Sequence, residues 1–196
     1  MEIAIKKLTP EFSADYFDFF DNRAFTDNSP YRCYCQMYQM SKEQCKKEFE
    51  NAKDSDYGLL SKNIAKQQIE SGALCGYLAY MDGKPVGWCN ANDRANFPSD
   101  PQCDVIFHSP TPQCEFAVVC FEIAPDHRGR GIATALLDRA VSDAKVNGFS
   151  SVVGFPVKRS ERYEWDCTGP IRLYEKAGFH KISEHGDTVI MKKELL

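Results

Sequence analysis

The stretch IAPDHRGRGIATALL at residues 123–137 decides how this chain of 196 residues is interpreted. It continues a nearly unbroken apolar run, 114–123, which is typical of a strand buried on both faces. Gly129 and Gly131 follow, and the apolar residues of 133–144 then recur three and four positions apart, which predicts an amphipathic helix. A strand, a glycine turn and a helix in immediate succession indicate an α/β fold.

The start of this helix is a predicted anion site. The first N–H groups of a helix have no partner within it, and the helix dipole is positive at that end. Gly129 and Gly131 have no side chain that would obstruct a ligand, and Arg128 and Arg130 add positive charge. A diphosphate is the natural ligand of such a turn, and a tight turn that binds nothing is the alternative.

Two other nucleotide motifs do not fit this turn. A phosphate-binding loop ends in Gly-Lys-Ser or Gly-Lys-Thr, which is absent here. A dinucleotide fingerprint lies near the first strand of its βαβ unit and has a third glycine where this chain has Thr134. Neither class of nucleotide-binding protein is therefore favoured.

The remaining segments predict one α/β domain over 1–196, with a helical N-terminal part at 1–72 and a core at 73–193. The expected fold is a mixed central β-sheet flanked by helices, with long loops at 93–113 and 156–169. Strands are predicted at 2–7, 73–81, 85–92, 114–123, 150–155, 179–183 and 187–193. Helices are predicted at 13–22, 41–52, 57–71, from the glycine turn to Asn147, and at 170–178.

Composition excludes several classes of protein. Hydrophobic residues make up 43% and charged residues 27%, which is ordinary globular usage. A net charge of -4 argues against a nucleic-acid partner, because neutralising phosphates requires surplus Lys and Arg. No segment approaches the roughly 20 apolar residues of a membrane helix. The N-terminus lacks the apolar core of a signal peptide, so a cytoplasmic location is expected.

Nine cysteines are scattered along the chain without a Cys-x-x-Cys pair, so reduced thiols are expected and a disulfide framework is not. The closely spaced pair Cys33 and Cys35 has three interpretations. It can form a thiol site near the substrate together with Cys120, it can bind a metal, or it can simply lie in a loop. The Cys-x-Cys spacing is shorter than zinc sites use, so no metal site is expected.

Two blocks resemble the GNAT N-acetyltransferase superfamily. Residues 123–137 are similar to its motif A, R/Q-x-x-G-x-G/A, which Arg128 through Ala133 match. The block IRLYEKAGF at 171–179 resembles motif B, in which a short helix carries a tyrosine before a K-x-G-F ending. The resemblance extends over about 73–193 and reaches the N-terminal third only by topology.

This resemblance implies an N-acetyltransferase that moves the acetyl group of acetyl-CoA directly to an amine of a small molecule or peptide. Acetyl-CoA would lie where strand 114–123 separates from the next parallel strand, with its pantetheine arm along the backbone near Phe121 and Ile123. Its diphosphate would lie on the amides of the turn. The expected cofactor-binding residues are Phe121, Ile123, Arg128, Gly129, Arg130, Gly131, Ile132, Ala133 and Thr134.

The resemblance also implies catalytic residues. Tyr174 matches the tyrosine that protonates the departing CoA thiolate, and a phenol with a pKa near 10 can do so. Family members use a glutamate, a histidine or water as base. The matching positions here carry Ala117 and Val119, which leaves Glu115 on the same face and Glu122 on the other. Glu122 is preferred because it lies nearest the expected acetyl position.

Alternatives remain open at this point. A non-catalytic acetyl-CoA sensor would bind the cofactor without turnover, and a redox protein built on Cys33 and Cys35 would lose function on alkylation. Cations of the 156–169 loop could face an acidic acceptor, or the loop could be a solvated connection. A homodimer is also open, since dimers are common in the family.

Overall fold

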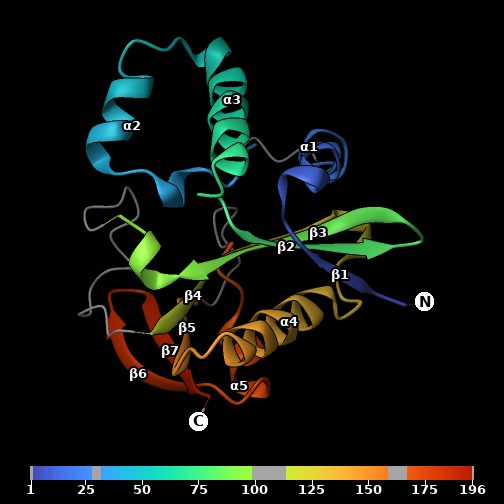
Figure 1. Cartoon of the computed structure of the whole chain (residues 1–196), viewed down its shortest axis with the longest axis vertical. Helices are drawn as coiled ribbons and strands as arrows, with labels where there is room; N and C mark the ends of the chain where they lie inside the picture. Colours follow the sequence, from blue (N-terminus) through green and yellow to red (C-terminus); the bar gives the residue numbers. More distant parts are fainter. Residues whose placement is uncertain (1, 28–31, 99–113, 159–166, 196) are drawn as a thin grey trace.

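The computed structural model describes residues 2–27, 32–98, 114–158 and 167–195, so much of the two expected long loops, including Arg159 and Arg162, lies outside it. In these ranges seven strands form a single sheet in the order β1-β2-β3-β4-β5-β7-β6, with five α-helices around it (Figure 1). The β4–β5 pair is parallel and the other pairs are antiparallel. The predicted α/β class with a mixed sheet is confirmed.

Every strand and helix predicted from the sequence is present, with ends that differ by a few residues. The strands are Ala4–Lys7 (β1), Gly76–Met81 (β2), Lys84–Asp93 (β3), Glu115–Ile123 (β4), Ser151–Gly154 (β5), His180–His185 (β6) and Thr188–Glu194 (β7). The helices are Ser13–Asn22 (α1), Lys42–Phe49 (α2), Tyr57–Glu70 (α3), Ile132–Val146 (α4) and Ile171–Lys176 (α5).

The sheet lies between two groups of helices. Figure 1 shows α4 on one side of the sheet and α1 to α3 on the other, and the contacts of α4 with β2, β3 and β4 agree. On the opposite face the ring of Trp88 from β3 lies 5.0 Å from that of Tyr16 in α1. The apolar stripe of α4 is buried at Ile132, Leu136, Leu137, Ala140 and Ala144. The helix that begins at the glycine turn is thus held firmly against the sheet.

The β4 strand contains a bulge that changes which side chains share a face. Asn90 of β3 pairs with Cys120, but the next residue, Ala91, pairs with Val118, so Val119 has no opposite residue. A bulge of this kind inserts one residue and shifts the alternation of side chains. Glu122, which is opposite Trp88, therefore lies on the same face as Ala117, and the expectation that it lies on the other face is wrong.

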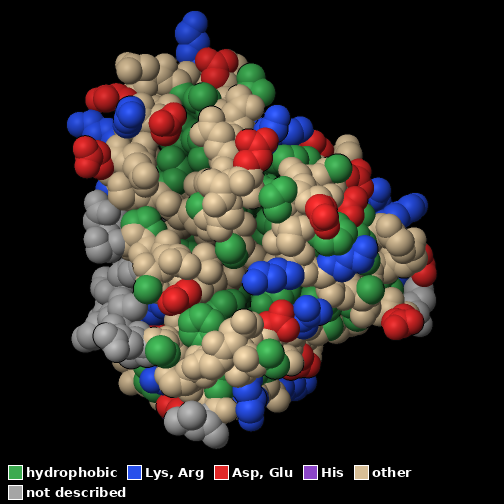
Figure 2. All heavy atoms as spheres, viewed as in Figure 1, with side chains coloured by type: hydrophobic (Ala, Val, Ile, Leu, Met, Phe, Trp, Pro, Cys, Tyr) green, Lys and Arg blue, Asp and Glu red, His purple; other side chains and the backbone are tan. Residues whose placement is uncertain are grey.

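The surface is mixed in charge. Figure 2 shows basic and acidic side chains interspersed over the face that it presents. Within the described ranges, no helix combines the length and the apolar character that crossing a membrane requires.

Candidate functional site

The turn before α4 has the backbone that only glycine adopts easily. Gly129 and Gly131 have φ values of +77° and +83°, in the left-handed region that other residues disfavour. A Cβ atom added at either position would meet no atom within 4 Å. Both glycines are therefore required by the backbone rather than by packing, and the space above them is open.

The amides of this turn are available to a ligand. The first helical hydrogen bond of α4 runs from the N–H of Ala135 to the carbonyl of Gly131, at 3.0 Å. Within the part of the chain that the structure describes, the N–H groups of 129–134 make no backbone hydrogen bond outside α4. These donors converge at the positive end of a helix dipole, which is the arrangement that binds a diphosphate. The predicted cofactor residues from Gly129 to Thr134 therefore lie together and fit such a group.

The side chain of Arg128 is bound by protein groups beside the turn. Its guanidinium lies 2.7 Å from Asp27 and 3.6 Å from Glu122, and its Nε donates to the carbonyl of Ile123 at 3.2 Å. It thereby ties the turn to the end of β4, and two carboxylates share its charge. The carbonyl of Ile123, in the stretch of β4 expected to lie along the pantetheine arm, accepts this bond.

The pairing of β4 with β5 ends halfway along β4, and we call the stretch beside residues 119–123, where the two strands no longer pair, the gap. β4 pairs with β5 only from Glu115 to Val118 in the part of the chain that the structure describes, so residues 119–123 extend past that ladder. Here the N–H of Phe121 donates to the carbonyl of Cys167 at 2.5 Å. Residues 167–169, the plug segment, thus lie along β4 where pantetheine is expected.

Tyr174 of α5 lies at the same gap. It is fully buried, and its hydroxyl donates to the carbonyl of Thr168 in the plug segment at 2.8 Å. Its ring covers Gly154 at the end of β5, where an added Cβ would lie only 2.1 Å from the ring. Burial raises the pKa of Tyr174 well above that of an ordinary phenol. The hydroxyl therefore stays protonated, which is the form that a proton donor needs.

The two candidate carboxylates have different environments. Glu115 is buried, forms an ion pair with the buried Arg94 and also contacts Ser151 at 3.3 Å and Lys192 at 3.5 Å. Such a group is structural, because it is held on all sides by partners. The side chain of Glu122 is 18% exposed and lies beside the turn. Of the two, Glu122 remains the candidate base.

Cysteines from three distant segments lie around this gap: Cys33 and Cys35, Cys120, and Cys167. Cys167 is the one that no sequence pattern indicated. Hydrogen bonding with Cys167 and with Cys35, together with burial, raises the pKa of the Cys120 thiol. The Tyr38 hydroxyl lies 3.1 Å from the Cys167 Sγ. No local pattern marks Cys167 in the sequence, because its neighbours come from β4 and from the N-terminal part of the chain.

These cysteines are thiols, and their environments differ. Burial raises the pKa of Cys33. A hydrogen bond from Cys120, and a weaker contribution from Tyr38, lower the pKa of Cys167 although burial opposes them. Within the described residues, all cysteines are free and no group of three or more His, Cys, Asp or Glu is arranged to bind a metal ion.

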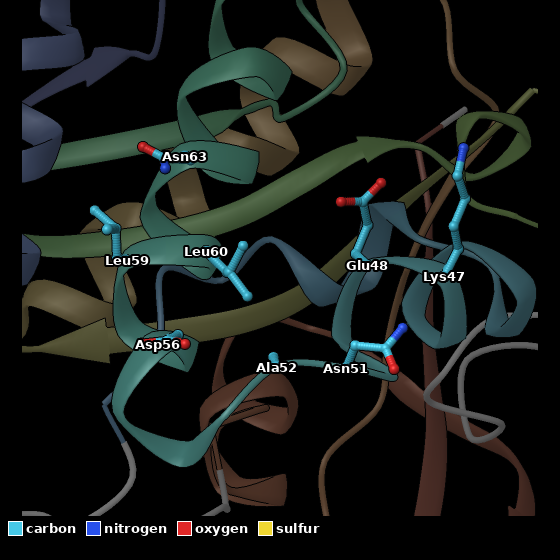
Figure 3. Close-up of a pocket in the computed structure, with 8 residues that line it drawn as sticks. All are labelled: Lys47, Glu48, Asn51, Ala52, Asp56, Leu59, Leu60 and Asn63. Atoms are coloured by element: carbon cyan, nitrogen blue, oxygen red, sulfur yellow. The ribbon is translucent and has the colours of Figure 1, made fainter.

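A separate hollow lies on the surface between α2 and α3 (Figure 3). It measures about 420 Å³, and none of its residues belongs to β4, α4 or α5. It is lined by Lys47, Glu48, Asn51, Ala52, Asp56, Leu59, Leu60 and Asn63. The hollow is therefore distinct from the gap beside β4.

A diphosphate cradle at a strand-to-helix turn, beside a gap between parallel strands, defines a coenzyme A-binding α/β protein. The family model of the acetyltransferase (GNAT) family matches residues 34–179. The chain therefore belongs to the GNAT family, whose members use acetyl-CoA as acyl donor. Among curated protein sequences, none matches the chain.

Solved structures of low sequence identity share the fold. The PaiA N-acetyltransferase from Thermoplasma acidophilum, in complex with coenzyme A, is 15% identical with a TM-score of 0.55, and 99% of each chain is covered. YncA, a putative acetyltransferase from Salmonella typhimurium with its cofactor acetyl-CoA, is 15% identical with a TM-score of 0.52 over 99% of this chain and 94% of its own. Ard1 from Thermoplasma volcanium is 15% identical with a TM-score of 0.53, and the match covers 100% of this chain and 99% of the Ard1 chain.

Proposed function

We propose that this chain is an acetyl-CoA-dependent N-acetyltransferase that transfers the acetyl group directly to an amine of a small molecule or peptide. The observation that carries the proposal is the row of amides at 129–134 at the start of α4, which make no backbone hydrogen bond outside α4 among the described residues and include two glycines with open surroundings. That row suits the diphosphate of coenzyme A. Membership of the GNAT family supports the same donor.

In the proposed reaction each residue of the site has one role. The amides from Gly129 to Thr134 hold the diphosphate, and β4 near Phe121 and Ile123 receives the pantetheine arm. Glu122 accepts the proton that the attacking amine must lose, and Tyr174 donates a proton to the departing thiolate. The cradle, the carboxylate and the phenol all lie at the open end of β4, which is why one bound thioester can reach all three.

The test is a turnover assay with acetyl-CoA and a panel of amines, read by the release of free thiol, together with calorimetry of coenzyme A binding. We expect saturable binding and amine-dependent thiol release. Saturable binding with no release for any amine would instead support the alternative of a non-catalytic sensor. Absence of binding would overturn the proposal altogether.

Tyr174→Phe should lower kcat about 100-fold, the usual contribution of a positioned proton donor, while KM for acetyl-CoA changes little. The variant keeps the ring that packs over Gly154 and removes only the hydroxyl. Steady-state kinetics measure both constants. Tyr80→Phe is the matched control, since it also removes a hydroxyl bonded to protein, here to Asp15 at 2.7 Å. Undiminished turnover in Tyr174→Phe would exclude the acid role.

Glu122→Gln should lower kcat/KM for the amine about 100-fold at neutral pH, because glutamine cannot accept the proton. The loss should shrink as the pH approaches the pKa of the amine, since a growing fraction of substrate is then already neutral. Glutamine can still contact Arg128, so coenzyme A affinity should persist in calorimetry. The exposed Glu48→Gln on α2 is the control. A loss that stays constant with pH would argue against Glu122 as the base.

A further inference from the structure

The plug segment, residues 167–169, engages two of the groups that the proposed reaction needs, the Phe121 amide and the Tyr174 hydroxyl. The N–H of Phe121 donates to the carbonyl of Cys167, and the hydroxyl of Tyr174 donates to that of Thr168. A Cβ added at Gly169 would lie 3.4 Å from the ring of Phe121, so this residue also lies against β4. The segment therefore has to leave the gap before pantetheine can pair with β4.

A pair of thiols spans the same contact. Cys167 belongs to the plug segment and Cys120 precedes Phe121 on β4. The backbone hydrogen bond from Phe121 to Cys167 holds the two chain segments side by side, as adjacent strands are held, and neighbouring backbones at that spacing can bring two cysteines within disulfide range. Cys167 is half-buried, whereas Cys120 is buried.

We propose that Cys120 and Cys167 are a redox modification site, and that a disulfide between them keeps the plug segment in the gap and prevents acetyl-CoA from binding. The consequence for acetyl-CoA rests on the proposed function, whereas the disulfide itself does not. The oxidant would be a hydroperoxide.

The chemistry balances with one equivalent of hydroperoxide. The thiolate of Cys167 attacks the terminal oxygen, the O–O bond breaks, and a sulfenic acid and one water or alcohol form. The Cys120 sulfur then attacks the sulfenic sulfur, and its proton leaves with the hydroxyl as water. Formation of the disulfide removes two electrons from the two thiols, and the peroxide accepts these electrons. A dithiol reductant restores both thiols by exchange.

Cys167 is the better initial nucleophile of the cluster. The hydrogen bonds from Cys120 and Tyr38 favour its thiolate, which is the reactive form. Cys35 is the rival partner, because Asn90, which pairs with Cys120, also contacts Cys35. However, Asn90 donates to the Cys35 carbonyl at 3.2 Å and to its sulfur at 3.3 Å, and Cys35 is buried.

The first experiment maps the disulfide in the full chain. Protein treated with one equivalent of hydrogen peroxide is digested without reduction and analysed by mass spectrometry. We expect a linked peptide pair containing Cys120 and Cys167 that dithiothreitol separates. Cys167→Ser and, independently, Cys120→Ala should abolish it, whereas Cys45→Ser on α2 should not. A bridge from Cys120 to Cys35, a bridge from Cys33 to Cys35, or no bridge would overturn the proposal.

The second experiment tests whether the disulfide closes the gap. Hydrogen exchange at the Phe121 amide should slow on oxidation, and this measurement requires no coenzyme. Calorimetry should show coenzyme A affinity reduced about tenfold or more, because only the open fraction binds, with recovery on reduction and no change in Cys167→Ser. A disulfide that leaves either hydrogen exchange at the Phe121 amide or the affinity for coenzyme A unaltered would show that it does not close the gap. Failure of the reduced protein to bind would count against the proposed function alone, and the exchange result would still decide the closure.

Discussion

Gly131→Asp is expected to weaken coenzyme A binding by about 100-fold or more, because juxtaposed like charges cost several kcal/mol. The new carboxylate would project into the open space above the turn, where a Cβ meets no atom within 4 Å. That space is where the amides of 129–134 point in the proposed complex. Calorimetry with coenzyme A measures the loss directly.

The fold should survive this substitution. The φ of +83° at Gly131 is tolerated better by Asp than by most residues, so the strain costs about 1 kcal/mol. Gly148→Asp is the matched control, since Gly148 has a φ of +79°, equally open surroundings and a position just past the opposite end of α4. Gly131→Asp should lose less thermal stability than Gly148→Asp, because a carboxylate is favoured at the N-terminus of a helix and disfavoured at its C-terminus, yet only Gly131→Asp should lose affinity. Equal affinities of the two variants for coenzyme A would contradict diphosphate binding at the turn before α4.

Most of the fold could be predicted because its signals are local. The alternation or continuity of apolar residues marked each strand, and the run from Gly129 to Ala144 contained both the turn and the helix. The capping box that starts α2 is likewise local. Ser41 accepts from the N–H of Gln44 at 3.1 Å, and Gln44 accepts in return at 2.8 Å, as the spacing predicts.

The site could be predicted only in part, because several of its features depend on pairing between distant segments. The bulge at Val119 is set by the register of β3 against β4, so the alternation read from β4 alone placed Glu122 on the wrong face. The contact of Cys167 with Cys120 and Tyr38 has no local signature either. The partner of Glu115 is Arg94, which follows β3 in a stretch expected to be loop.

Glu115→Ala is expected to lower the free energy of unfolding by about 3–5 kcal/mol, the cost of breaking a buried ion pair. Both side chains of the Glu115–Arg94 pair are 1% exposed, so the guanidinium would lose its carboxylate in a place that little water reaches. Urea denaturation measures the change. Glu184→Ala is the control, because Glu184 forms its ion pairs on the surface, where they contribute little, and the free energy of unfolding should change far less.

A double variant separates the contribution of the ion pair to stability from that of side-chain packing at the same position. Replacing both partners, Glu115→Leu with Arg94→Met, should recover most of the stability lost in Glu115→Ala, since an apolar pair of similar volume has no charge to compensate. If Glu115→Ala cost no more than the surface control, the ion pair would not be holding β4 to the segment after β3.

A further variant, Glu115→Gln, tests catalysis at this position. If it kept its stability but lost turnover, the role of base would move from Glu122 to Glu115.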